Sequence, residues 1–208
     1  MFTGIIEEVG RVRSVEDLET GRRLAIDAGA AREDMHLGDS IALDGVCTTV
    51  VGVYPGGFTI EAIGTTLSRT TLGAFAPGRR INLEQPMRLG DRLGGHLVQG
   101  HVDAVGQVTG IRREGEHVLL DVRMPEEVAE ITVLHGSIAI NGVSLTVNQL
   151  LPEDVAQVAL IPYTWEHTNL SDLSIGDGVN LEADMLGKFV AQLAKRHGSV
   201  GVPSVENR

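Results

Sequence analysis

The feature that most constrains this sequence is an internal duplication. Residues 40–50 and 137–147 are identical at 7 of 11 positions when they are aligned with an offset of 97. Residues 4–12 resemble residues 100–108 at an offset of 96, and a third block recurs later at an offset of 98. A shared preference for β-hairpins would explain one such likeness, but three blocks in the same order indicate a duplicated domain.

The two copies occupy residues 1–90 and 95–184. Solenoids bury their core by stacking three or more repeats, so two copies predict two compact, similar domains instead. Within each copy the pattern is that of β-structure. In the first copy, residues 40–53 mix β-branched with small residues, and residues 58–63 follow a Pro-Gly-Gly turn as the next strand.

Turn signals are frequent along the chain. Glycine accounts for 26 of the 208 residues, well above its usual share of about 7%. Asp44 and Asn141 each precede a glycine, and such dipeptides favour the positive φ angles of tight turns. Short strands between such turns predict an all-β fold of closed antiparallel barrels, because closure leaves no unpaired edge strand.

The second copy is followed by a segment that the first copy lacks. Apolar residues recur at helical spacing between residues 185 and 197, and Asp184 is placed to cap the start of this helix. A helix appended to two complete domains has no core of its own. It packs either back on a barrel or against another subunit, and the sequence leaves both arrangements open. Residues 198–208 are expected to form a flexible tail.

Charge and hydropathy exclude several classes of function. The net charge of −11 disfavours binding to nucleic acids or to an anionic membrane surface. The first eight residues lack the basic and apolar regions of a secretory signal. No apolar run approaches the roughly 20 residues needed to cross a bilayer. We therefore expect a soluble cytoplasmic protein without nucleic-acid or membrane partners.

Hydroxyl side chains recur at matching positions of both copies. They are Ser40, Thr49, Thr66 and Thr70 in the first copy, and Ser137, Thr146, Thr164 and Thr168 in the second. Neutral hydrogen-bonding groups at strand ends suit a polyol or a pyrimidine-dione ligand. Two matching pockets would suit a protein that handles two copies of one ligand. The alternatives are that the hydroxyls bond locally to turns, or that one copy has only a structural role.

Cys47 is the sharpest single candidate for chemistry. It is the one cysteine of the chain and stands where the second copy has Ser144. A thiolate there would serve as nucleophile or base, whereas a lone cysteine is more often a small core residue. His101 stands where the first copy has Ile5, and it is either a proton carrier or a surface histidine. One cysteine and scattered histidines give no closed ligand set, so no metal is expected.

Five segments carry a resemblance to a known family. They are residues 1–6 (MFTGII), 38–50 (GDSIALDGVCTTV), 90–103 (GDRLGGHLVQGHVD), 141–147 (NGVSLTV) and 161–164 (IPYT). In this order they resemble the riboflavin synthase family of the alpha-chain type, and the likeness extends to about residue 195. Three residues depart from the family pattern: Thr65 stands in place of Glu, Tyr163 in place of His or Glu, and Trp165 in place of Leu.

The resemblance implies both an architecture and a reaction. The fold would be two six-stranded Greek-key barrels with a C-terminal helix that assembles a homotrimer. Each barrel would bind one 6,7-dimethyl-8-ribityllumazine, at a site between the N-terminal barrel of one subunit and the C-terminal barrel of the next. One lumazine would give four carbons to the other, producing riboflavin and 5-amino-6-(D-ribitylamino)uracil without a cofactor. Lumazine synthase is a candidate protein partner.

The resemblance also assigns residues to two half-sites. The first half-site would use Gly4, Ile5, Ile6, Ser40, Cys47, Thr48, Thr49, Ile63, Gly64 and Thr66, with Thr65 as its departure. The second would use Gly100, His101, Val102, His135, Ser144, Leu145, Thr146, Ile161, Pro162 and Thr164, with Tyr163 as its departure. Phe2 and Asp184 match positions near the reaction.

For catalysis we expect Cys47 and Ser144 near the reacting carbons, His101 as proton carrier, and Asp184 as an orienting group or base. Holding two rings in contact lowers the barrier by about 7–11 kcal/mol. One acid or base accelerates the reaction ~10²–10⁴-fold, which corresponds to about 3–5 kcal/mol. The rival hypothesis is a non-catalytic lumazine- or flavin-binding protein on the same fold. A purely structural double barrel would leave the repeated hydroxyls unexplained.

Overall fold

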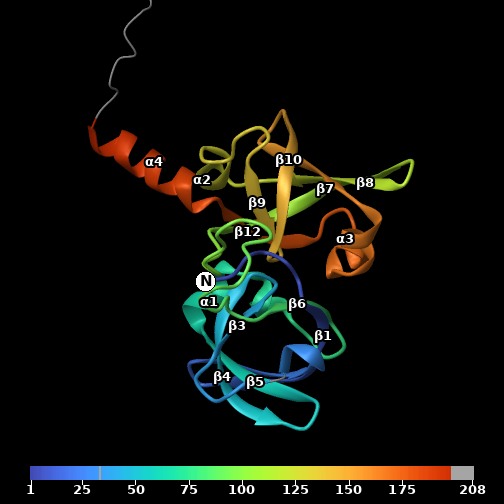
Figure 1. Ribbon diagram of the computed structural model, residues 1–208, viewed down its shortest axis with the longest axis vertical. Helices are drawn as coiled ribbons and strands as arrows, with labels where there is room; N and C mark the ends of the chain where they lie inside the picture. The colour runs from blue at the N-terminus through green and yellow to red at the C-terminus, as the bar shows by residue number, and fades with distance from the viewer. Residues whose placement is uncertain (33, 198–208) are drawn as a thin grey trace, which may run out of the picture.

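The computed structural model describes residues 1–32 and 34–197, which form two closed antiparallel barrels and a C-terminal helix (Figure 1). The strands of the first barrel are β1 (Glu8–Leu18), β2 (Gly21–Asp27), β3 (Ser40–Leu43), β4 (Val46–Tyr54), β5 (Gly57–Ile63) and β6 (Arg80–Glu84). Those of the second are β7 (Ala104–Glu114), β8 (His117–Arg123), β9 (Ser137–Ile140), β10 (Val143–Leu151), β11 (Val155–Leu160) and β12 (Gly178–Ala183).

Short helical segments connect the strands. The α-helices are α1 (Gly64–Arg69), α2 (Glu126–Ala129), α3 (Pro162–Glu166) and α4 (Met185–His197), and the 3-10 turns are η1 (Ala30–Arg32), η2 (Thr71–Ala74) and η3 (Asn169–Asp172). The predicted tail at 198–208 lies outside the described residues. No helix in the described part of the chain is long and apolar enough to span a bilayer.

Both barrels have the same strand order. The first runs β1-β2-β5-β4-β3-β6 and the second β7-β8-β11-β10-β9-β12, so each strand has a counterpart six strands later. In each barrel three strands joined by hairpins are followed by a fourth that returns beside the first of them, which is a Greek key. The predicted all-β fold of two six-stranded Greek-key barrels with a C-terminal helix is confirmed.

Each barrel has its own apolar core, built from alternate residues of its strands. In β6 the inward residues Ile81 and Leu83 are fully buried, as are Val179 and Leu181 of β12. The outward residues of these two strands are also buried, because their outer faces lie against the other barrel or against residues 2–6 and 98–102. These residues are Asn82, Glu84, Asn180 and Glu182.

The seam between the barrels is built around an approximate two-fold axis. The side-chain amide of Asn82 donates to the carbonyl of Asn141 at 2.9 Å, and that of Asn180 donates to the carbonyl of Asp44 at 2.9 Å. At the centre the two turns touch: a Cβ atom on Gly45 would lie 2.7 Å from the backbone nitrogen of Gly142. Only glycines therefore allow the turns to approach this closely.

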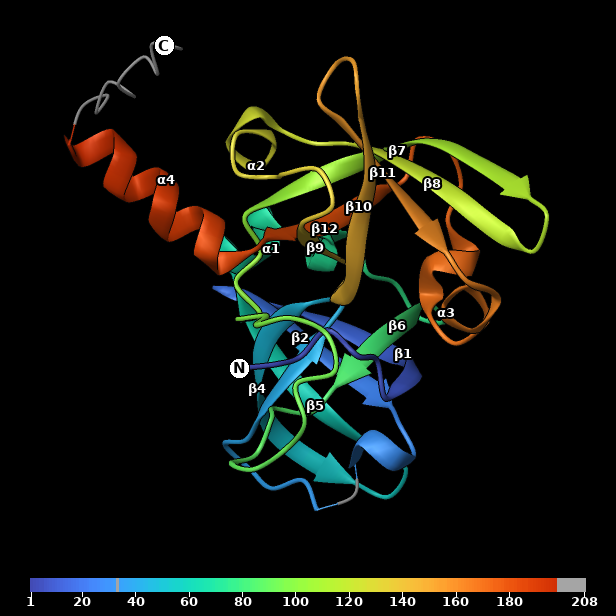
Figure 2. The same ribbon diagram turned by 45° about the horizontal axis from the view of Figure 1, so that its top comes forward.

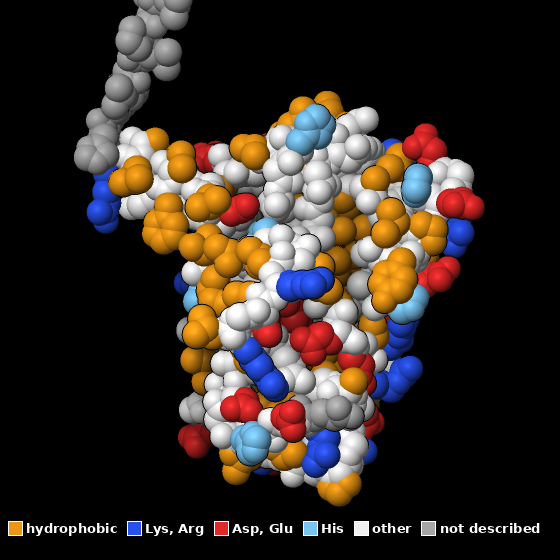
Figure 3. All heavy atoms as spheres, viewed as in Figure 1, with side chains coloured by type: hydrophobic (Ala, Val, Ile, Leu, Met, Phe, Trp, Pro, Cys, Tyr) orange, Lys and Arg blue, Asp and Glu red, His pale blue; other side chains and the backbone are white. Residues whose placement is uncertain are grey.

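Helix α4 extends away from both barrels (Figures 1 and 2). It is tied to the second barrel by two ion pairs, Lys188–Asp103 at 2.7 Å and Lys195–Glu130 at 2.9 Å. Its apolar residues remain 56–66% exposed; they are Leu186, Phe189, Val190 and Leu193. Figure 3 shows hydrophobic side chains gathered along this helix. The sequence left open whether this stripe packs on the chain's own barrels or against another subunit. Because the stripe is exposed, the first of these two arrangements is wrong.

Candidate functional site

Two extended arms, residues 2–6 and 98–102, run along the seam and pair with each other. Phe2 forms an antiparallel bridge with Val98, with backbone hydrogen bonds of 2.7 and 3.1 Å. Phe2 is completely buried in a small apolar cluster with Val98, Ala42 and Ala139, against which Cys47 packs. The arms therefore connect the two copies directly beside the residues singled out for chemistry.

Each arm passes along the barrel of the other copy. The amide of Ser144 donates to the carbonyl of Gly4 at 2.8 Å, and the amide of Cys47 donates to the carbonyl of Gly100 at 2.9 Å. Glycine is needed at both arm positions, because a Cβ atom on either would lie 2.6 Å from the Cβ of Ser144 or Cys47. Each half-site thus combines one barrel with the arm of the other copy.

This arrangement corrects the predicted grouping of residues. Gly4, with Ile5 and Ile6 after it, belongs beside Ser144 in the second half-site, and Gly100, with His101 and Val102, belongs beside Cys47 in the first. The resemblance placed them the other way round. The physical reason is the arm exchange, which no pattern within one copy indicates.

Two buried glutamates hold the arms in place. Glu84 accepts from the amides of Thr3 at 2.6 Å and Gly4 at 3.0 Å. Glu182 accepts from the amides of Gln99 at 2.6 Å and His101 at 2.8 Å. Burial raises the pKa of both carboxyl groups, and these backbone hydrogen bonds oppose the rise.

The first half-site is a shallow groove of about 240 Å³ beside Cys47. The Cys47 side chain is half-buried and reaches the groove from β4, while His101 reaches it from the arm. Helix α1 adds Thr65, Thr66 and Arg69. The groove therefore brings together a thiol, an imidazole, hydroxyls and one guanidinium, which suits a ligand rich in carbonyl and hydroxyl groups.

The second half-site contains a residue that the sequence analysis did not select. His96 is 8% exposed, and its Nδ1 lies 2.7 Å from the Oγ of Ser144. Burial lowers the pKa of His96, while the negative charge of Asp184 opposes this effect. The lowered pKa favours the neutral imidazole, which lies within hydrogen-bond distance of the Ser144 hydroxyl. Asp184 also caps α4, accepting from the amide of Leu186 at 2.9 Å. His96 lies within the 90–103 motif, but nothing in its local sequence distinguishes it from a surface histidine.

The helices α1 and α3 differ between the half-sites. On α3, the rings of Tyr163 and His167 stack with centroids 4.0 Å apart. The matching positions on α1 carry Thr65 and Arg69. The hydroxyls of Thr70 and Thr168 are used locally, since each donates to the carbonyl four residues earlier at 2.7 Å. For these two hydroxyls the local bonding alternative is correct.

The remaining predicted residues fall into three groups. Thr48 and Leu145 are buried, and Thr48 donates to the carbonyl of Ile41 at 3.0 Å. Ser40 pairs with Thr49 across β3 and β4, as Ser137 does with Thr146 across β9 and β10. Exposed positions at the strand–helix junctions and before β9 are Ile63, Gly64, Ile161, Pro162 and His135. Within residues 1–32 and 34–197, no cluster of three or more His, Cys, Asp or Glu could hold a metal.

Two equivalent barrels, each with a polar half-site completed by the other copy's arm, define a duplicated ligand-binding protein. The family model described as the lumazine binding domain matches residues 3–86 and 99–184. Riboflavin synthase of Mycobacterium tuberculosis is 46% identical over 202 residues, covering 95% of this chain and all of that protein. Riboflavin synthase of Bacillus subtilis is 40% identical over 190 residues, covering 91% of this chain and 88% of that protein. The chain belongs to the riboflavin synthase family.

Solved structures show the same fold. LumP complexed with riboflavin superposes with a TM-score of 0.82 at 24% identity, over 88% of this chain and 99% of that chain. LumP complexed with 6,7-dimethyl-8-(1'-D-ribityl) lumazine gives a TM-score of 0.80 at 23% identity, with the same coverage. These matches extend over both barrels.

Proposed function

We propose that this chain is a riboflavin synthase, which converts two 6,7-dimethyl-8-ribityllumazine molecules into riboflavin and 5-amino-6-(D-ribitylamino)uracil. A four-carbon unit leaves the donor lumazine and is joined to the acceptor. The electrons stay within the pair, so the reaction needs no redox cofactor. Membership of the family and the presence of two equivalent half-sites support this function.

One observation carries the proposal: Cys47 and Ser144 occupy equivalent positions in the two half-sites, and the backbone amide of each donates to an arm of the other copy. A dismutation needs two copies of one compound held in related poses. Two matched sites hold the two molecules in this way, and their orientation lowers the reaction barrier by about 7–11 kcal/mol. The unlike helices α1 and α3 would then distinguish donor from acceptor.

The residues suggest a division of labour in catalysis. The neutral imidazole of His96 would accept the proton of the Ser144 hydroxyl, or of a water molecule beside it, as this oxygen adds to the donor lumazine. Asp184 would stabilise the imidazolium that forms, because its negative charge opposes the lowering of the His96 pKa by burial. In the other half-site, Cys47 and His101 would move the protons of the second ring and its acidic C7 methyl group.

The active enzyme would be a homotrimer in the cytoplasm, with lumazine synthase as a candidate partner. The exposed stripe of α4, which includes Phe189 and Leu193, would be buried between subunits. The site would then form where the N-terminal barrel of one subunit meets the C-terminal barrel of the next. Two half-sites on separate subunits would bring their rings face to face.

The test is to mix the purified protein with the lumazine and follow the growth of riboflavin fluorescence. Cys47→Ser should retain part of the turnover, since orientation outweighs any single group. Phe189→Asp should remove nearly all of it, because a charge on the α4 stripe prevents assembly. Leu150→Asp, which alters an apolar residue 46% exposed at the end of β10, is the matched control. Equal losses in Cys47→Ser and Phe189→Asp would contradict the proposal.

The second candidate is a non-catalytic lumazine or flavin carrier. Thr65 and Tyr163, which depart from the family pattern, favour it because they change the polarity of both half-sites. A carrier would bind one lumazine tightly per chain, and riboflavin fluorescence would not grow. The same mixing experiment therefore separates the two functions.

A further inference from the structure

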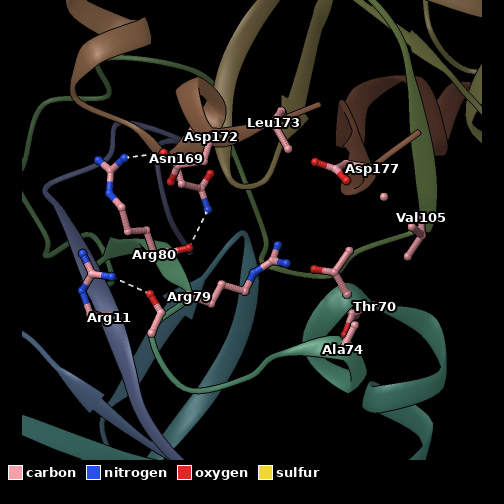
Figure 4. Close-up of a pocket in the computed structure, with 13 residues that line it drawn as sticks. Arg11, Thr70, Ala74, Arg79, Arg80, Val105, Asn169, Asp172, Leu173 and Asp177 are labelled. Atoms are coloured by element: carbon pink, nitrogen blue, oxygen red, sulfur yellow. Dashed lines mark hydrogen bonds and ion pairs between the residues drawn. The ribbon is translucent and has the colours of Figure 1, made fainter. Parts of the chain in front are cut away.

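A second cavity, of about 700 Å³, lies on the seam between the barrels (Figure 4). Its walls come from both copies: β1, η2 and β6 on one side, and β7, η3 and β12 on the other. Thr70 also lines the groove beside Cys47, but none of the other residues of the two half-sites lines this cavity. Its volume falls within the range of about 300–1,000 Å³ that is usual for sites of small organic ligands.

The first barrel gives this cavity a cationic wall of Arg11, Arg79 and Arg80. The second copy has Gln107, Asp177 and Gly178 at the matching positions. The duplicated fold therefore does not require these arginines, since the second barrel forms the same strands without them. On a chain with a net charge of −11, the three guanidiniums outnumber the two carboxylates that line the cavity, Asp172 and Asp177, and this excess of positive charge favours an anionic ligand.

Two of the three arginines have N–H groups without a hydrogen-bond partner among the described residues. Arg80 is engaged by Asp172 across the cavity at 2.7 Å. Arg11 donates from Nη1 to the carbonyl of Gly78 at 2.6 Å, which leaves its other N–H groups uncommitted within the described part of the chain. Arg79 lies over the ring of Phe75, and its Nη2 lies 3.6 Å from the buried Oδ2 of Asp44. Its buried Nε has no hydrogen-bond partner among the described residues.

Buried polar groups on the cavity wall also lack partners within residues 1–32 and 34–197. The hydroxyl of Thr71 is a donor on a residue 8% exposed, and the side-chain oxygen of Asn169 is an acceptor on a residue 4% exposed. Such groups are rarely left unsatisfied in folded proteins. An oxyanion would accept from Thr71 and the arginines, and a hydroxyl on the same ligand would donate to Asn169. Val105 and Leu173 provide an apolar surface beside them.

We propose that this cavity binds a phosphomonoester whose organic part carries hydroxyl groups, such as a sugar phosphate or a nucleoside monophosphate. A phosphate has three terminal oxygens for the guanidiniums of Arg11 and Arg79 and the hydroxyl of Thr71. The hydroxyl-bearing part occupies the remaining space against Asn169, Val105 and Leu173. This site is separate from the lumazine reaction, and the proposal does not depend on the proposed function.

The test is isothermal titration calorimetry of the full chain with three probes: inorganic phosphate, ribose 5-phosphate and adenosine 5′-monophosphate. At least one ester should bind at one site per chain, more tightly than inorganic phosphate. Arg11→Gln should weaken this binding about tenfold, the effect of losing one hydrogen bond to a charged group. This variant preserves the fold, because Gln107 makes the matching contact to Gly176 in the second copy.

Two further variants complete the design. Ala74→Asp places a carboxylate opposite the arginines, at the position that Asp172 occupies in the second copy. It should weaken ester binding at least as much as Arg11→Gln does. Arg113→Gln removes one positive charge from an exposed position outside the cavity and should leave ester binding unchanged. The proposal is overturned if neither ester binds at millimolar concentration or if Arg11→Gln binds as tightly as the unaltered protein. Equal binding of inorganic phosphate and the esters would overturn the assignment of an ester.

Discussion

Replacing Asp44 with asparagine should stabilise this protein at neutral pH. Asp44 is completely buried at the centre of the seam, where its Oδ1 accepts from the amide of Asn82 at 2.8 Å and from the side chain of Asn169 at 2.7 Å. Its Oδ2 has no hydrogen-bond partner in the described part of the chain, and Arg79 approaches only to 3.6 Å. The second copy has the neutral Asn141 at this position, so an amide fits the turn.

The magnitude follows from the pKa of Asp44. Burial raises it from its ordinary 3.8 to about 6, against the opposing effects of the Asn82 amide and Arg79. At 1.36 kcal/mol for each pH unit, the ionised carboxylate costs the folded state about 3 kcal/mol above pH 6. This is a large fraction of the total stability of about 5–15 kcal/mol that is usual for a folded domain.

The sign of the pH dependence follows directly. Because the pKa is higher in the folded state, folding binds a proton between the two pKa values, and stability is lost as the pH rises from about 4 to above 6. The amide introduced by Asp44→Asn does not titrate. The stability difference between this variant and the unaltered protein should therefore be about 3 kcal/mol at pH 7.5 and shrink to about 1 kcal/mol at pH 4.5.

Urea unfolding at both pH values, at one protein concentration, measures this difference. Asn141→Asp is the matched control. It buries a second carboxylate in the copy where Asp177 stands in place of Arg79, and the variant should lose about 3–5 kcal/mol of stability. The reasoning is refuted if Asp44→Asn is no more stable at pH 7.5, or if the difference is the same at both pH values.

Three other predictions concern the seam and the half-sites. His96→Gln should lower kcat/KM about 100-fold and abolish an acidic limb that lies below pH 6.5, because burial lowers the pKa of His96; an unchanged pH profile would exclude His96 from the reaction. Gly45→Ala should lose more than about 2 kcal/mol in urea unfolding, since it combines a φ of +77° with the 2.7 Å approach to Gly142; a loss below about 1 kcal/mol would mean that the turns separate easily. A bulky N-terminal tag should reduce turnover more than a C-terminal tag, because the buried Phe2 anchors the arm beside Cys47; equal turnover would contradict this placement.

Much of the fold is predictable because the chain can be compared with itself. The recurrence of residues 40–50 as 137–147 places equivalent β-hairpins in both copies, and the turns at Asp44 and Asn141 have the positive φ that their sequence favours. The helical spacing after Asp184 is likewise confirmed by α4. These features depend on local conformation and on the alternation of apolar residues, both of which are written in consecutive residues.

The candidate site was only partly predictable. The sequence selected Cys47, His101, Ser144 and Asp184, and the structure separates them into two clusters, with Cys47 beside His101 and Ser144 near Asp184. His96 was missed because its role depends on a contact with Ser144, 48 residues away. The resemblance assigned residues by their position along the chain and could not supply such contacts.

The sequence by itself determined the duplication, the β-structure of both copies, the C-terminal helix, and candidate residues such as Cys47 and Ser144. Only the tertiary structure decided which arm serves which barrel. Gly4 and Gly100 are the same residue type in matching segments, so either pairing satisfies the local pattern equally well. The choice is made by long-range hydrogen bonds to Ser144 and Cys47 and by the buried carboxylates of Glu84 and Glu182. Such bonds join residues far apart along the chain and exist only once both barrels have formed and met.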